Sequence, residues 1–153
     1  MPLKRIMYIS NLQIKCEGNK MKNSMTDKHK IELEYLLKTS PKVFENMVST
    51  PSGLAEWFAD DVNIKEDVYT FYWDGSEEQA KLLSKKAGHH MKWKWMREED
   101  EENDTFFEIQ YEVDPMTKTL VLHITDFAEE DDIEEVTMLW ESSIQELKRV
   151  LGA

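Results

Sequence analysis

The sequence predicts an α+β domain in which one antiparallel sheet of about six to seven strands is covered by a single long C-terminal helix. Several segments alternate apolar and polar residues with the period of two that is typical of half-buried strands. The final segment instead repeats apolar residues every three or four positions, and two helix-start signals follow the first strand. Because an antiparallel sheet needs one face covered, the C-terminal helix is expected to pack across it.

The first strand and two short helices are predicted near the start of the domain. Residues 29–39 alternate apolar and polar side chains, which predicts a strand. The pairs Ser40-Pro41 and Thr50-Pro51 each place a preferred N-cap residue before a proline at the first helical position. They predict one helix over 41–49 and another that begins at Pro51.

The middle of the chain is predicted to consist of strands joined by turns. Lys65-Glu66-Asp67 and Asp74-Gly75 are turn signals, and the acidic run Glu98–Glu102 is interpreted as a solvated turn. The predicted strands cover residues 62–64, 68–73, 78–85, 90–97, 106–113 and 119–127.

The last helix is the best-defined element of the sequence. Four acidic residues, 129–132, suit the positive end of a helix macrodipole. Apolar residues then recur at helical spacing over 133–151, with Lys148 and Arg149 in the last turn. Gly152 follows as a C-cap.

Charge and composition exclude several classes of protein. The net charge of −12 disfavours nucleic acid and anionic membrane surfaces as partners. No apolar run reaches the length of a membrane span. The one cysteine, Cys16, excludes an internal disulfide and a cysteine zinc site, and it fits a reducing, cytoplasmic location.

Residues 1–24 differ from the rest of the chain. Residues 1–30 hold seven Lys/Arg against two acids. Met21 and Met25 both precede the first structural pattern. We interpret residues 1–24 as a flexible extension or as the product of an upstream start codon, and residues 28–153 as the domain.

Several segments of the domain resemble a known family. Residues 50–58 (TPSGLAEWF) resemble the pattern T-(D/P)-x-x-x-L-x-x-W-F, and TPSGLAEWFADDVN, YTFYWDGSEEQAKLL and ITDFAEEDDIEEVTMLWESSI extend the likeness over 28–153. The chain resembles the START-like (SRPBCC or Bet v 1-like) superfamily, in a Bacteroidetes family related to activators of the heat-shock-protein-90 ATPase. The resemblance implies a helix-grip fold, with a curved sheet wrapped on the last helix.

The resemblance also implies a binding site between the sheet and the last helix, because the superfamily binds lipids, sterols and similar molecules there. Fourteen residues are the predicted lining of such a site for a small hydrophobic or amphipathic ligand: Trp57, Phe71, Trp73, Trp93, Trp95, Phe107, Ile109, Tyr111, Leu122, Ile124, Val136, Trp140, Ile144 and Leu147. The alternative interpretation is that these residues fill the space as an ordinary core, which the many indole rings favour.

A protein-interaction role is the second functional hypothesis. The resemblance implies a module related to activators of a chaperone ATPase, although full-length activators carry a further N-terminal domain. An acidic surface would attract a basic partner. The sequence does not define an oligomeric state.

Nothing in the sequence predicts an enzyme, a cofactor or a metal site. The four histidines lack metal-ligand spacing and the acidic runs lack the pattern of a calcium loop. No nucleophile elbow, phosphate loop or dinucleotide motif is present. His123 alternates with the apolar residues of its strand, so it is expected to face solvent.

Overall fold

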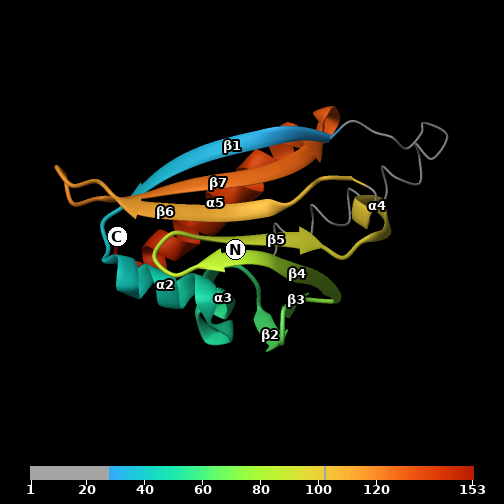
Figure 1. Ribbon diagram of the computed structural model, residues 1–153, viewed down its shortest axis with the longest axis horizontal. Helices are drawn as coiled ribbons and strands as arrows, with labels where there is room; N and C mark the ends of the chain where they lie inside the picture. Colours follow the sequence, from blue (N-terminus) through green and yellow to red (C-terminus); the bar gives the residue numbers. More distant parts are fainter. Residues whose placement is uncertain (1–27, 102) are drawn as a thin grey trace.

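The fold was determined from a computed structural model, which describes residues 28–101 and 103–153 (Figure 1). Residues 1–24, interpreted above as an extension, lie outside the described residues. The elements are β1 (Lys28–Leu37), α2 (Pro41–Ser49), α3 (Pro51–Trp57), β2 (Asp61–Lys65), β3 (Val68–Trp73), β4 (Ser76–Lys86), β5 (His90–Trp95), α4 (Glu98–Glu101), β6 (Phe107–Val113), β7 (Leu120–Glu129), the 3-10 turn η2 (Glu130–Asp132) and α5 (Ile133–Leu151).

Within the described part of the chain, seven antiparallel strands form one sheet in the order β1-β7-β6-β5-β4-β3-β2. The long helix α5 runs behind the sheet, while α2 and α3 lie at one end of it (Figure 1). The predicted α+β class, the helix-grip arrangement and the two short helices after the first strand are confirmed. We call the face that α5 covers the inner face and the opposite one the outer face.

The two short helices begin at the predicted caps. The Ser40 hydroxyl accepts a hydrogen bond from the Val43 N–H at 3.1 Å, and the Thr50 hydroxyl accepts one from Gly53 N–H at 2.9 Å. A Cβ added at Gly53 would lie 2.0 Å from the carbonyl oxygen of Asn46. Only glycine therefore allows α3 to approach α2 this closely, and this corner carries Trp57 into the core.

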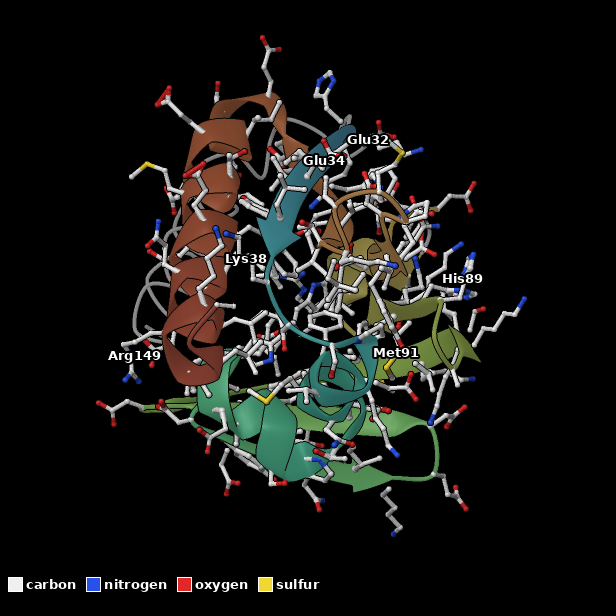
Figure 2. The ribbon with its side chains drawn as sticks, turned by 90° about the vertical axis from the view of Figure 1, so that its left-hand side faces the viewer. Glu32, Glu34, Lys38, His89, Met91 and Arg149 are labelled. Atoms are coloured by element: carbon white, nitrogen blue, oxygen red, sulfur yellow. The ribbon has the colours of Figure 1, made fainter. Side chains whose placement is uncertain are left out.

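The helix α5 has nineteen residues, as its apolar period predicts. Its buried residues are Val136, Leu139, Trp140, Ser143, Ile144 and Leu147, which form one stripe facing the sheet. Gly152 ends the helix in the left-handed conformation, with φ 71°. Figure 2 shows Arg149, near the end of α5, and His89, before β5, on opposite sides of the molecule.

The acidic run after β5 differs from its prediction as a solvated turn. Glu98–Glu101 form the short helix α4, and Asp100 is 3% exposed. Its carboxylate accepts a hydrogen bond from the Thr105 hydroxyl at 2.8 Å and pairs with Arg97, whose Nε lies 3.1 Å away. These two flanking residues compensate the loss of hydration, so one carboxylate of the run can be buried.

Candidate functional site

The structure places all fourteen predicted lining residues in the protein interior. Each of them is 7% exposed or less, and together they come from α3, β3, β5, β6, β7 and α5. The alternation along the strands and the helical period of α5 account for the burial of those on the strands and on α5, and their role as the lining of a ligand site stays a prediction. Whether they bind a ligand is a separate matter, which depends on what fills the space between them.

Aromatic rings occupy the centre of this space. The Phe107 ring stacks on Trp93 and Trp95, with centroid distances of 4.9 and 4.8 Å. Phe58 and Trp140 approach the same ring at 6.0 and 6.5 Å. One phenyl ring is thus in contact with four other aromatic rings, which is the arrangement of a close-packed core. A ligand at this point would have to displace one of them.

Three of the buried indole N–H groups have a hydrogen-bond acceptor that holds the ring in place. Trp57 donates to the Met47 carbonyl at 2.9 Å, Trp73 to the Phe58 carbonyl at 3.1 Å, and Trp140 to the Asp126 carboxylate at 2.8 Å. These bonds tie α3, β3 and α5 to their neighbours. The rings are therefore fixed by polar contacts as well as by packing.

Among the residues that the structure describes, two buried polar groups on the inner face have no such acceptor or donor. They are the indole Nε1 of Trp93 and the hydroxyl of Tyr35. Burial, and secondarily the charge of Glu141, raise the pKa of Tyr35 to about 12. A buried polar group without a partner costs about 1–3 kcal/mol of stability. A polar ligand atom that formed a hydrogen bond with either of these two atoms would remove that cost.

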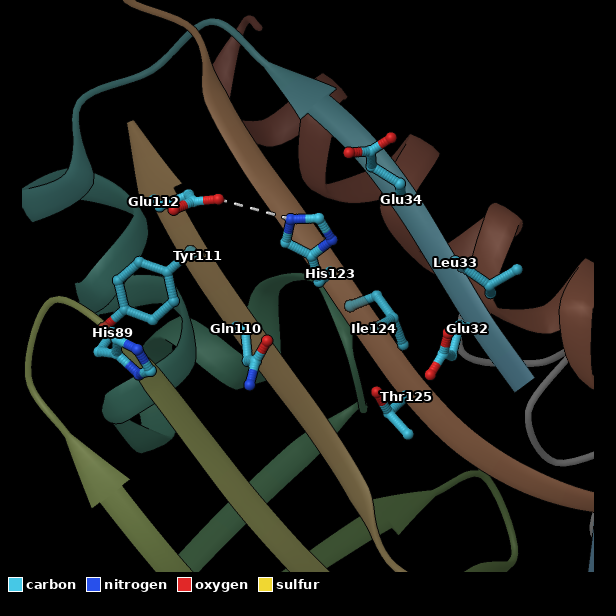
Figure 3. A pocket seen from close by; sticks show the side chains of 10 residues that line it. All are labelled: Glu32, Leu33, Glu34, His89, Gln110, Tyr111, Glu112, His123, Ile124 and Thr125. Carbon is cyan, nitrogen blue, oxygen red and sulfur yellow. Dashed lines mark ion pairs between the residues drawn. The ribbon is translucent and has the colours of Figure 1, made fainter. Parts of the chain in front are cut away.

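A hollow of about 520 Å³ lies on the outer face of the sheet. Its lining comes from β1, β6, β7 and the turn before β5: the outward residues Glu32, Glu34, His89, Gln110, Glu112, His123 and Thr125, and between them the inward residues Leu33, Tyr111 and Ile124. Figure 3 shows His123 and Thr125 on β7, between Glu32 and Glu34 on one side and Gln110 and Glu112 on the other. We call this hollow the outer groove; β7 forms its floor and the side chains of β1 and β6 form its walls.

The outer groove is negatively charged. Its acids are Glu32, Glu34 and Glu112. His123 lies 3.7 Å from the Glu112 carboxylate and Lys30 lies 3.3 Å from that of Glu32. Three carboxylates line the groove and one lysine pairs at its rim. The groove therefore favours positively charged groups.

A hydrogen-bonded cluster fixes the end of the groove that His89 forms. The Glu45 carboxylate on α2 accepts from the Gly88 N–H at 2.8 Å and from the Tyr111 hydroxyl at 3.0 Å. Burial, followed by the hydrogen bond to Glu45, raises the pKa of Tyr111 to about 12. The rings of His89 and His90 are joined through their Nδ1 atoms at 2.7 Å. The turn that carries His89 is thus anchored to α2 and β6.

The sequence predicted part of this site. His123 lies on the outer face, as expected from alternation, and is half-buried. The groove itself was missed, because it requires Glu34 on β1 to lie beside His123 and Gln110 on β7 and β6. That register joins segments about 80 residues apart in sequence, and no local pattern contains it.

Candidate metal sites and membrane-spanning helices are absent from residues 28–101 and 103–153. In this part of the chain no group of three or more His, Cys, Asp or Glu side chains could hold a metal ion. No helix in the same residues combines the length and the apolar character needed to cross a bilayer.

Comparison with known proteins relates the chain to one superfamily. A family model described as START-like superfamily domain matches residues 25–153. The solution structure of BfR322 from Bacteroides fragilis is 35% identical, with a TM-score of 0.57, over 80% of this chain and 90% of that one. No curated protein matches the chain.

More distant structures share the fold. The Aha1 dimer from Colwellia psychrerythraea is 16% identical with a TM-score of 0.69, over 80% of this chain and 96% of that one. CalU16 from Micromonospora echinospora is 15% identical with a TM-score of 0.64, over 81% and 76% of the two chains. The family model, the 35% identical structure and the helix-grip arrangement agree: the chain belongs to the START-like superfamily.

Proposed function

We propose that this START-like domain is a non-enzymatic protein-interaction module that binds its partner through the outer face of the sheet. The observation that carries the proposal is the contrast between the two faces. The Phe107 ring and its four aromatic neighbours occupy the inner face, whereas the outer face has an acidic groove of about 520 Å³.

The overall charge supports an interaction role. The chain has a net charge of −12, which would accelerate its encounter with a basic surface. The resemblance to activators of a chaperone ATPase, and the fold shared with the Aha1 dimer, make an ATPase of that kind the first partner to test. We place the interaction in the cytoplasm, because the one cysteine fits a reducing compartment.

Site-specific photo-crosslinking tests the proposal. A photoreactive amino acid is placed at Gln110 on the outer face or, as the control, at Met138, an exposed residue of α5. After irradiation in the host cell, the proposal predicts a reproducible protein adduct from position 110 and none from position 138. Adducts from position 138 alone would place the binding surface on the helix and contradict the proposal.

A small ligand on the inner face is the second candidate function. It is favoured by the unpartnered Trp93 indole N–H and Tyr35 hydroxyl, each of which a polar ligand atom could satisfy. Such a ligand would carry a hydrogen-bond acceptor on an apolar body and would displace aromatic rings on entry. Native mass spectrometry of the protein from its host, followed by denaturation in the same run, tests it: an excess mass that disappears on denaturation supports the ligand.

A further inference from the structure

The outer groove is built from two polar rows of side chains that run across β1, β7 and β6. The first row is Glu32 and Thr125, continued beyond the groove lining by Glu108 and by Lys92 of β5, and the second is Glu34, His123 and Gln110. Glu112, one row further along β6, reaches back to within 3.7 Å of His123. In the first row Glu32 and Glu108 therefore lie on the two sides of β7, and beside the second row Glu34 and Glu112 do so.

The spacing of these rows matches an extended chain. Consecutive outward residues of a strand are about 6.7 Å apart, and β1 and β6 lie about 9.6 Å apart across β7. An extended segment along β7 would direct every second side chain into the groove at the same interval of about 6.7 Å. Two basic side chains at alternate positions would meet the Glu32–Glu108 row and the Glu34–Glu112 pair in succession.

An exposed apolar row adjoins the acidic rows. Leu36 on β1 is paired with Val121 on β7, next to the row that contains Glu34 and His123. Leu36 is 58% exposed, so covering its side chain with an apolar group of a partner would remove apolar surface from water. An apolar side chain at the next alternate position of the bound segment would cover Leu36 and Val121.

From the charge complementarity and the neighbouring apolar row, we infer that the outer groove binds an extended segment of a partner protein with two Lys or Arg residues at alternate positions and an apolar residue at the next alternate position. This inference rests on the proposed function and specifies its partner. The basic residues occupy the acidic rows, and the apolar residue covers Leu36 and Val121. The segment is held by its side chains on the face of the sheet.

Peptide binding to the full-length protein tests the inference at 150 mM salt and pH 7.5. The probe is a fluorescein-labelled peptide with arginines at two alternate positions and leucine at the next alternate position. A second peptide of the same composition has adjacent arginines and a distant leucine. Fluorescence anisotropy should give about fivefold or more tighter binding for the first peptide, because only its spacing lets both charges pair in the groove.

Matched variants distinguish the contribution of the groove to peptide affinity from that of the net charge of the protein. Glu34→Gln with Glu112→Gln should weaken the first peptide about fivefold to tenfold, whereas Glu77→Gln with Glu134→Gln removes two exposed charges elsewhere and should weaken it less than twofold. Leu36→Ser should reduce the affinity about threefold. Equal weakening by the two double variants would overturn the inference, because binding would then follow net charge alone.

The crosslinking experiment distinguishes failure of the inference from failure of the proposed function. If position 110 crosslinks a protein but the two peptides bind equally, the inference is wrong and the proposed function stands. If position 138 alone yields protein adducts, the proposed function fails, whatever the peptides do.

Discussion

The two faces of the sheet are made by the same strands but differ in burial, packing and charge. On the inner face, Phe107 is 1% exposed and stacked on two indole rings. On the outer face, His123 and its carboxylate neighbours line an open groove. In this START-like domain the face that the superfamily resemblance singled out is thus the better packed one. This difference favours the outer face of the sheet, rather than the inner face, as the proposed binding surface.

The largest effect on stability is expected for a substitution that creates a cavity in the inner face. Trp140→Ala removes a fully buried ring and the indole that donates to Asp126. It should lower the free energy of unfolding by about 3–5 kcal/mol. Met138→Ala, on the exposed side of α5, should change it by less than about 0.5 kcal/mol. Urea unfolding measures both, and a loss below about 1.5 kcal/mol for Trp140→Ala would show that the inner face is not tightly packed.

A pair of conservative substitutions distinguishes a bonded indole from an unpartnered one. Trp57→Phe loses the hydrogen bond to the Met47 carbonyl and should cost about 1–2 kcal/mol beyond the loss of ring volume. Trp93→Phe removes an N–H that has no acceptor, so its cost should be smaller by about that amount.

The same urea measurement compares these two variants. Equal losses of unfolding free energy would mean that the Trp93 N–H is bonded to something in solution. That outcome would support the inner-face ligand, especially if a co-purified mass disappeared in Trp93→Phe.

The inner face should also limit stability at alkaline pH. Tyr35 and Tyr111 both lie next to Leu122 of β7, and burial raises the pKa of each from 10.0 to about 12. The folded state therefore favours the neutral phenols. Their stabilising contribution is complete below pH 10 and is lost as the pH rises through 12. The melting temperature should fall over this interval, and less steeply in Tyr35→Phe/Tyr111→Phe; an identical slope would contradict the assignment.

The smallest effect on stability is expected on the outer face. Glu34 and Glu112 are exposed, and exposed ion pairs contribute little to stability. The double variant Glu34→Gln/Glu112→Gln should therefore change the free energy of unfolding by less than about 0.5 kcal/mol. The same variant is expected to weaken peptide binding. On this face, binding affinity should therefore change without a matching change in stability. A loss above about 1.5 kcal/mol would instead indicate that these carboxylates maintain the fold.

Most of the fold could be predicted from the sequence because its signals are local. Ser40-Pro41 and Thr50-Pro51 marked the helix starts, and the period of α5 gave its nineteen residues. The burial of Asp100 was missed, because it depends on Arg97 and Thr105 folding around the carboxylate. A run of acidic residues generally predicts that their side chains are exposed to solvent. One of them can still be buried when neighbouring residues form hydrogen bonds or ion pairs with its carboxylate.

The candidate site was less predictable, for reasons of register and packing. The alternation of apolar and polar residues predicted which strand residues face inward. It does not determine whether side chains such as Phe107 and Trp140 leave a space between them. The outer groove depends on the pairing of β1 with β7 and of β7 with β6. A shift of one residue in either pair would move Glu34 or Gln110 to the other face.

The most direct test of the account is a ¹⁵N–¹H spectrum of the full-length protein, in which the indole N–H signals of Trp57, Trp73, Trp93, Trp95 and Trp140 report the inner face. The sample is titrated first with the arginine-leucine peptide and then with a lipid extract of the host. The account predicts that the peptide shifts the backbone amides around Glu34 and His123 and that neither addition moves an indole signal. Movement of the Trp93 indole with the lipid extract, and unchanged outer-face amides with the peptide, would contradict it.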